Sequence, residues 1–480
     1  MKHYPLLLAK DIKTEEKMDV VAPYDLSVIA TIDCASELHI QQALKTAHQC
    51  YKNRSEWLST PKRIEILERV VVLMSEQHDK LALASAHEGG KPLMDSLAEV
   101  TRAIDGIKIC IETLRTDSGD VIPMNYNNAS ANRIAFTQRE PIGVVVAVSA
   151  FNHPVNLIVH QVGSAVAAGC PVIVKPASDT PLSCMHIVDI FHQAGLPREW
   201  CQAMVIADNE LATTLVTDSR VAFFSFIGSA KVGWKLRSQL APGTRCALEH
   251  GGVAPVIVEA DADFEKTIPA LTKGGFYHAG QVCVSVQRVY VHEKIAEKLA
   301  QALAKSASEL QVGDPTLKET EVGPFIRPSE LQRVDQCVQE AIAQGAQALC
   351  GTRAITETCY APTVLFNPPD DATISQNEVF GPVICVYSYE DLDEAITRAN
   401  ALPFAFQAAV FTNNLSYAMY AYQRLAASAV MLNDHTAFRV DGMPFAGLKH
   451  SGLGVGGIPY SIHDMQVEKM LVMKLEESLK

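Results

Sequence analysis

The residues that most directly indicate the fold are 143–176, which read GVVVAVSAFNHPVNLIVHQVGSAVAAGCPVIVKP. A β-branched apolar run at 143–151 is followed by a helix-length segment at 155–168 and by a second apolar run at 172–176. Short apolar runs separated by helix-length segments are typical of parallel strands joined by crossover helices, because both faces of such strands are buried. This stretch therefore predicts a strand–helix–strand unit of an α/β fold.

The same alternation extends along most of the chain. It continues to residue 249, restarts at residue 254 and returns at 362–409. At about 150 residues per domain, a chain of 480 residues has room for two or three domains. We therefore expect two α/β domains in series.

The composition disfavours several classes of protein. A formal net charge of −13 at pH 7 argues against a nucleic-acid partner, which requires a basic surface. No apolar run approaches the roughly 20 residues of a membrane span, and the N-terminal sequence resembles neither a signal peptide nor a transit peptide. The 12 cysteines include no Cys-x-x-Cys pair and the 15 histidines form no His-Glu-x-x-His motif. We therefore expect no metal site and a reducing, cytoplasmic compartment.

Two segments are expected to project from the main sheets. Residues 120–139 are Asn-rich and flanked by strand-like sequence, which predicts a hairpin, and residues 464–474 alternate as a strand does. The second segment has no evident partner in its own domain, and an unpaired strand edge is a template for pairing. We therefore expect the two pieces to meet across a subunit interface of a homodimer or homotetramer.

Cys283 is the candidate nucleophile. It ends the segment Gly274–Cys283, GGFYHAGQVC, in which a glycine turn after a helix allows close approach of the backbone to a ligand. Two polar residues at predicted strand ends favour chemistry: Glu249 as a general base and Asn152 as an amide donor. Taken singly, a cysteine is more often a small buried hydrophobe, Glu249 a solvated strand end and Asn152 a helix N-cap.

Candidate cofactor contacts lie at the same predicted strand ends. Lys175 ends the strand after Asn152, and Gly228-Ser229, followed by Gly233, opens a helix after a later strand. The N-terminal amides of a helix can bind a phosphate group, although a glycine pair at this spacing is a weak signal by itself.

In order and spacing, these segments resemble the aldehyde dehydrogenase superfamily. Two further motifs, Asn377–Val383 (NEVFGPV) and Pro444–Gly452 (PFAGLKHSG), extend the resemblance from about residue 61 to the end of the sequence. The resemblance implies two Rossmann-like α/β domains plus a small β element for oligomerisation. It implies a cofactor-binding domain at 1–118 and 141–248, a catalytic domain at 249–460, and the oligomerisation hairpin and C-terminal strand at 119–140 and 461–480.

The resemblance also implies roles for individual residues. Cys283 adds to the aldehyde, Asn152 donates to the oxyanion, and Glu249 activates the water that hydrolyses the thioester. Relatives that transfer the acyl group to coenzyme A tend to lack this Glu, so a non-acylating oxidation to the carboxylic acid is implied. The implied cofactor contacts are Lys175, Ser178, Gly228, Ser229, Gly233, Glu378 and Phe380.

The cofactor is expected to be NADP or NAD. NAD-selective members often carry a Glu three residues after the Lys of this motif, where this chain has Ser178. A neutral hydroxyl removes repulsion against a 2′-phosphate, with which Lys175 could pair. Ser178 is equally suited to capping the following turn. NADP is therefore expected to be accepted, with NAD as the alternative.

Three cationic positions bear on the substrate: Arg102 on a long predicted helix, His153 directly after the Asn, and Arg439 shortly before Pro444. Together they suit a small anionic aldehyde. The Asn-His-Pro sequence resembles phosphonoacetaldehyde dehydrogenases, with succinate-semialdehyde and lactaldehyde enzymes as close alternatives. Arg102 and Arg439 are equally compatible with solvated or salt-bridged residues.

Two other functions stay open at the level of sequence. A cysteine-dependent hydrolase or acyltransferase would use Cys283 without redox chemistry, and a catalytically silent relative would serve only as a binding protein. The intact set of Cys283, Glu249 and Asn152 disfavours the silent relative.

Overall fold

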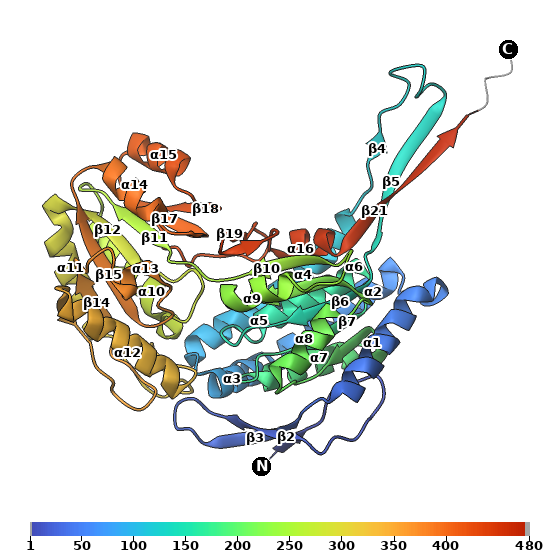
Figure 1. Ribbon diagram of the computed structural model, residues 1–480, viewed down its shortest axis with the longest axis horizontal. Coiled ribbons are helices and arrows are strands. Elements are labelled where there is room, and N and C mark those ends of the chain that lie inside the picture. Colours follow the sequence, from blue (N-terminus) through green and yellow to red (C-terminus); the bar gives the residue numbers. More distant parts are fainter. Residues whose placement is uncertain (1, 476–480) are drawn as a thin grey trace.

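Two mainly parallel sheets and a projecting arm make up the structure, a computed structural model that describes residues 2–475 (Figure 1). Residue 1 and residues 476–480, which belong to the predicted ranges 1–118 and 461–480, lie outside the described residues. All twelve cysteines are free thiols. None of the described helices is long and apolar enough to cross a membrane.

The first sheet contains the strand–helix–strand unit expected at 143–176. β6 (Val144–Val148) and β7 (Val172–Lys175) pair in parallel, and a helical segment at 156–168 joins them. Residues 144–147 are buried, as strands covered on both faces must be. The other strands are β8 (Cys201–Ala203), β9 (Val221–Ile227), β10 (Arg245–Glu249) and the antiparallel β20 (Gly452–Leu453), in the order β20-β10-β9-β6-β7-β8. The helical elements are α5 (Asn156–Ile158), the π turn η2 (Val159–Gly163), α6 (Ser164–Ala168), α7 (Pro181–Gln193), η3 (Arg198–Trp200), α8 (Asn209–Thr217) and α9 (Ala230–Arg237).

The second sheet has its own set of helices. Its strands are β11 (Pro255–Val258), β12 (Arg288–His292), β13 (Gln347–Cys350), β14 (Thr363–Phe366), β15 (Val383–Tyr389), β17 (Gln407–Phe411) and β18 (Ala429–Leu432), in the order β13-β14-β15-β12-β11-β17-β18 with only β13 antiparallel. Its helices are α10 (Phe264–Phe276), η4 (Tyr277–Gly280), α11 (Glu293–Ser308), α12 (Pro328–Ala343), α13 (Thr373–Gln376), α14 (Leu392–Asn400) and α15 (Leu415–Arg424). The predicted α/β fold with two Rossmann-like sheets is confirmed, whereas the exact domain limits stay a prediction.

The N-terminal part packs against the first sheet. It comprises β1 (Lys2–Tyr4), β2 (Lys17–Val21), β3 (Val28–Asp33), α1 (Glu37–Lys52), η1 (Arg54–Glu56), α2 (Thr60–Glu76), α3 (His78–Gly89) and α4 (Leu93–Thr116). The long helix α4 buries Val100, Ala103 and Ile107 at helical spacing, in one core with residues of β6 and β7. The C-terminal end of α4 leads into the arm.

The arm is a three-stranded sheet that projects from the rest of the molecule (Figure 1). Its strands are β4 (Val121–Ile122), β5 (Arg133–Pro141) and β21 (Gln466–Lys474). β21 runs antiparallel to β5, from Gln466 opposite Pro141 to Lys474 opposite Arg133. The expectation that the hairpin and the C-terminal strand meet across a subunit interface is therefore wrong. They pair within one chain, because α16 (Ile458–Asp464) packs against α4 and α6 and brings residue 466 to the end of β5.

Two short strands complete the described elements, β16 (Phe404–Ala405) and β19 (Leu448–Lys449), which pair with each other. This pairing joins the segment just before β20 to the segment just before β17 of the second sheet. The chain therefore crosses back from the second sheet to the first just before β20 and α16.

Candidate active site

Cys283 follows a left-handed turn after α10. His278, Ala279 and Gly280 have φ angles of 50°, 52° and 67°. Residues other than glycine rarely adopt positive φ, and a Cβ at residue 280 would lie 2.1 Å from the carbonyl oxygen of Gly381. Only glycine therefore fits at 280, and the strain at the two preceding residues persists because the surrounding structure holds them in place.

Gln281 fixes this turn and links it to Asn152. The Gln281 side chain accepts a hydrogen bond from the Ile326 N–H at 3.0 Å and donates to the carbonyl of Pro324 at 3.1 Å. The backbone carbonyl of Gln281 accepts from Asn152 Nδ2 at 2.9 Å. Because Gln281 stands two positions before Cys283 in the sequence, this hydrogen bond places Asn152 beside the segment that carries the nucleophile. The second N–H of the Asn152 amide has no partner among residues 2–475.

Burial favours the neutral form of the Cys283 thiol. Burial raises its pKa to about 12, the charge of Arg439 lowers this pKa, and the charges of Glu378 and Glu249 raise it further. A thiolate is the nucleophilic form, so a thiol with such a pKa needs a base. Glu249 ends β10, and a Cβ at Gly456 would lie 2.4 Å from its Oε1. The Glu249 carboxylate therefore lies against the backbone of Gly456. From there its charge acts on the Cys283 thiol.

Glu378 and Phe380 lie in the segment between α13 and β15. The Gly252 N–H donates a hydrogen bond to Glu378 Oε1 at 3.3 Å, and burial raises the pKa of this carboxyl to about 8. Phe380 packs edge-on against Phe151, with 5.9 Å between the ring centroids. Gly252 follows β10 and Phe151 follows β6, so both predicted cofactor contacts face loops of the first sheet.

The other predicted cofactor contacts lie at the carboxyl end of the first sheet. Lys175 ends β7, and Ser178 is in the loop from β7 to α7. Gly228 and Ser229 connect β9 to α9, and the Ser229 side chain does not cap the helix. The first backbone N–H groups of α9 are therefore open to an acceptor, and Gly233 has no room for a side chain. This donor set fits the phosphates of a dinucleotide.

The three predicted substrate cations differ in their partners. Arg102 donates from Nε and Nη2 to Asp441 at 3.0 and 2.8 Å. Asp441 also accepts from His160 Nε2 at 2.7 Å and from Asn156 Nδ2 at 2.9 Å. Burial opposes ionisation of Asp441, but His160 and Arg102 hold its pKa far below the usual range. Burial lowers the pKa of His153 well below its ordinary value, so this ring is neutral.

Arg439 has no such carboxylate partner. Its guanidinium stacks on Phe445, 3.6 Å from the ring centroid. Its Nε and Nη2 are buried and have no hydrogen-bond partner among residues 2–475. A buried, unsatisfied donor is costly, and this one acts electrostatically on Cys283. The arrangement suits an anionic ligand next to the thiol.

Sequence patterns did not reveal the partners Asp441 and Gln281. Asp441 meets Arg102 from 339 residues away, a separation that no periodicity can show. Gln281 stands in the Gly-Gln-x-Cys motif, but the hydrogen bonds of its amide follow from its burial at 1% exposure, which the sequence does not show.

Comparison with known proteins agrees with this geometry. The model of the aldehyde dehydrogenase family matches residues 11–471. A 3-sulfolactaldehyde dehydrogenase from Priestia aryabhattai is 36% identical over 462 residues, which cover 96% of each chain. A lactaldehyde dehydrogenase from Methanocaldococcus jannaschii is 34% identical, covering 95% of this chain and 97% of the relative.

Solved structures give the same result. Aldehyde dehydrogenase 21 from Physcomitrella patens, in complex with the reaction product succinate, superposes with a TM-score of 0.95 at 33% identity, covering 100% of this chain and 99% of that chain. Glyceraldehyde-3-phosphate dehydrogenase from Methanocaldococcus jannaschii, complexed with NADP, has a TM-score of 0.91 at 34% identity, covering 96% of this chain and 100% of that chain. The chain therefore belongs to the aldehyde dehydrogenase family and is an NAD(P)-dependent aldehyde dehydrogenase.

Proposed function

We propose that this enzyme oxidises a small aldehyde with a negatively charged tail to the carboxylic acid, with NADP as acceptor and NAD as the alternative. The observation that carries the proposal is Arg439, a buried guanidinium whose Nε and Nη2 have no partner among the described residues and whose charge acts on Cys283. The relative named for 3-sulfolactaldehyde and the structure that holds succinate support an acidic tail.

In the first chemical step the thiol proton of Cys283 passes to Glu249, which releases it to solvent, and Sγ adds to the carbonyl carbon to make a thiohemiacetal. The aldehyde oxygen gains negative charge and needs donors that are already in place. The free N–H of the Asn152 amide and the backbone N–H of Cys283 are such donors. Loss of one donor of this kind typically costs about 10²–10³ in rate.

The second step releases the acid. A bound nicotinamide supplies the hydride acceptor, and Cys283 then carries the acyl group as a thioester. Glu249 takes a proton from the water that attacks this thioester. The residues that hold the cofactor in this proposal are Lys175, Ser178, Gly228, Ser229, Gly233, Glu378 and Phe380.

The charges around the site favour a single negative charge on the substrate. Asp441 neutralises Arg102, and His153 is uncharged. Arg439 therefore supplies the net positive charge of the three predicted cations. Arg102 and His153 contribute hydrogen-bond donors. A carboxylate or sulfonate tail is favoured over a dianionic phosphonate, because the second charge would meet no second free cation among Arg102, His153 and Arg439.

Absorbance at 340 nm tests the proposal directly. Short aldehydes of similar size with carboxylate, sulfonate, phosphonate or neutral tails are each mixed with the protein and NADP or NAD. The proposal expects the highest kcat/KM for the carboxylate or sulfonate substrate with NADP. Propanal turning over as efficiently as the anionic aldehydes would contradict the charge recognition.

The same assay separates the two alternatives. A cysteine-dependent hydrolase or acyltransferase would cleave an activated ester through Cys283 and form no reduced nicotinamide with any aldehyde. A catalytically silent protein would bind NADP without either activity.

We also propose a homo-oligomer in the cytoplasm. The arm exposes Met470, Leu471 and Val472 on β21, each at 43–53% exposure, and an apolar edge strand favours pairing with another copy. Twelve free thiols suit a reducing compartment. Light scattering on the purified protein tests the first point: a monomer would contradict it.

A further inference from the structure

A buried ion pair lies behind the loop that carries Asn152. Lys91 precedes α4 and Glu99 lies within it, and their side chains are each 1% exposed and bonded to each other. Ser85 Oγ adds a contact of 3.4 Å to the Glu99 carboxylate. Removing two charges from water costs several kcal/mol per ion, so stability alone is a weak reason for such a pair.

Glu99 reaches across to the segment that follows Asn152. Its Oε1 accepts hydrogen bonds from the backbone N–H groups of Val155 and Asn156, both at 2.9 Å. These groups lie at the start of a helical segment, where backbone N–H groups lack intrahelical acceptors. A carboxylate at this position gives strong, charge-assisted bonds. Glu99 therefore fixes where the helical segment begins, three residues after Asn152.

Asn152 is held from its other side as well. Its Nδ2 donates to the carbonyl of Gln281, in the turn before Cys283. The distance from the Asn152 amide to the thiol thus depends on two anchors, the Gln281 carbonyl on one side and the Glu99 carboxylate on the other. A misplacement of about 1 Å in such a constellation can cost roughly 10²-fold in rate.

We propose that Glu99, paired with Lys91, is a positioning residue that places Asn152 against the oxyanion. The inference rests on the proposed function, because the oxyanion arises when Cys283 adds to a carbonyl. Glu99 touches neither substrate nor cofactor in this arrangement: it acts through the backbone of Val155 and Asn156.

Glu88 provides a matched control within the same chain. It is fully buried near the end of α3, and its two carboxylate oxygens accept from the N–H groups of Leu182 and Ser183 at 2.8 and 2.7 Å. These are the first-turn amides of α7, which follows the loop with Lys175 and Ser178. Glu88 therefore fixes where α7 begins, after Ser178, as Glu99 fixes where the helical segment after Asn152 begins.

The experiment compares Glu99→Gln with Glu88→Gln in the full-length protein. Glu99→Gln is expected to lower kcat by about tenfold or more and to leave the Kd for NADPH, measured by fluorescence, unchanged. Glu88→Gln is expected to weaken NADPH binding and to keep kcat near wild type at saturating cofactor. Equal losses of kcat in the two variants would overturn the inference.

Two further measurements separate positioning from damage to the fold. Lys91→Met/Glu99→Gln removes the unpaired ammonium that the single variant leaves, so it should recover thermal stability without recovering kcat. Hydrogen exchange at the amides of residues 155 and 156 should accelerate in Glu99→Gln, and this readout needs no turnover. Recovery of kcat in the double variant, or unchanged exchange, would overturn the inference. Failure of the wild type to oxidise any aldehyde would instead refute the proposed function.

Discussion

Cys283 and Cys385 are both deeply buried thiols, but their surroundings differ in ways that predict different reactivity. Burial raises the pKa of both thiols to about 12. Cys385 lies inside β15, is completely buried, and has Arg288 and Tyr387 nearby. Cys283 lies after a strained turn, beside Arg439 and Glu249. The two thiols therefore differ in the polar groups that surround them.

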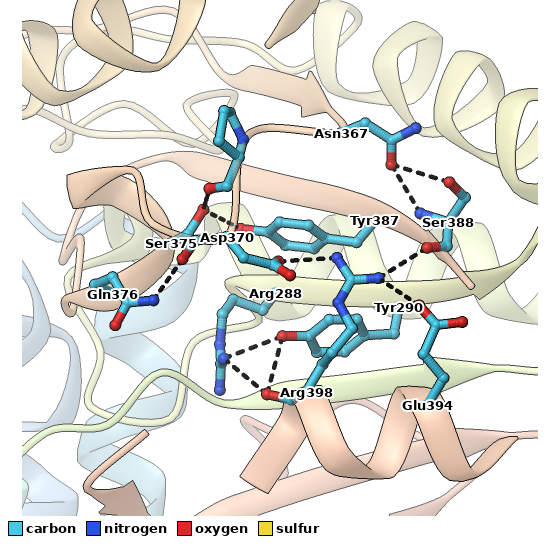
Figure 2. Close-up of polar contacts among 11 residues, drawn as sticks. Arg288, Tyr290, Asn367, Asp370, Ser375, Gln376, Tyr387, Ser388, Glu394 and Arg398 are labelled. Carbon is cyan, nitrogen blue, oxygen red and sulfur yellow. Dashed lines mark hydrogen bonds and ion pairs between the residues drawn. The ribbon is translucent and has the colours of Figure 1, made fainter. Parts of the chain in front are cut away.

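Most polar groups near Cys385 satisfy one another, although Arg398 Nε is buried and has no partner in the described chain. Figure 2 shows the Arg398 guanidinium bound to Asp370 at 2.9 Å and to the carbonyl of Ser388 at 2.9 Å. Arg288 donates to Tyr290 Oη at 3.0 Å, and its other nitrogens reach backbone carbonyls. Arg439, near Cys283, leaves two nitrogens without a partner in the described chain. The difference is one of degree: Arg398 bonds through two of its three guanidinium nitrogens, whereas Arg439 keeps both Nε and Nη2 without a partner. The proposed anion site uses this larger unmet capacity of Arg439 to donate hydrogen bonds.

The sharpest test of the comparison is to replace each thiol. Cys283→Ser is expected to lower aldehyde oxidation by roughly 10⁴-fold or more and to leave the melting temperature unchanged. Cys385→Ser is expected to keep kcat near wild type and to lower the melting temperature, because it buries a hydroxyl among polar groups whose hydrogen bonds are mostly already made. Steady-state kinetics and thermal denaturation measure both effects. A loss of activity in Cys385→Ser without a loss of stability would break the comparison.

The pH dependence of alkylation is the next largest effect. Because the pKa of Cys283 is raised to about 12, the thiolate fraction in the free enzyme rises about tenfold for each pH unit below that value. Reaction of Cys283 with iodoacetamide should therefore accelerate about 10³-fold from pH 6 to pH 9. Mass spectrometry of the Cys283 and Cys385 peptides measures this, with Cys385 expected to stay unlabelled. The rate should keep rising above pH 9, whereas an ordinary thiol with a pKa of about 8.5 would level off there and contradict the raised value.

Replacing Arg439 or Arg398 is expected to have a smaller effect on kinetics than replacing Cys283. Hydrogen bonds to a charged group are worth roughly 1.5–3 kcal/mol, so Arg439→Met should raise KM for an anionic aldehyde about 10- to 100-fold and change KM for propanal little. Arg398→Met should leave both KM values unchanged and lower the melting temperature. The two variants are compared on the same pair of aldehydes. Equal changes for both aldehydes in Arg439→Met would rule out charge recognition.

Cofactor selectivity is expected to change least. Ser178→Glu places a carboxylate near the expected 2′-phosphate, and a repulsion of about 1 kcal/mol corresponds to a roughly fivefold loss of kcat/KM with NADP relative to NAD. Ser178→Ala is the matched control and should keep the selectivity of the wild type. Loss of stability in both variants with no change in selectivity would indicate that Ser178 only caps the turn.

The local parts of the site could be predicted from the sequence, whereas its long-range pairings could not. A strand followed by Asn152 and a helix, or a glycine turn before Cys283, is encoded within about ten residues. The pairing of Arg102 with Asp441 depends on how the two sheets come together, so the sequence could not decide that Arg102 is salt-bridged while Arg439 has no carboxylate partner among the described residues. The left-handed conformation of His278 also lacks a local signal, because only its surroundings hold it.

The pairing of β21 with β5 has a consequence for the order in which the chain folds. Residues 133–141 emerge from the ribosome roughly 15–65 s before residues 466–474, at about 5–20 residues per second. During that interval β5 has an open edge, which is a template for pairing with another nascent chain. β20, which pairs with β10 beside Glu249, emerges almost as late. The strand that carries the proposed base therefore gains its last neighbour only after residues 452 and 453 have been made, shortly before β21 can close the arm.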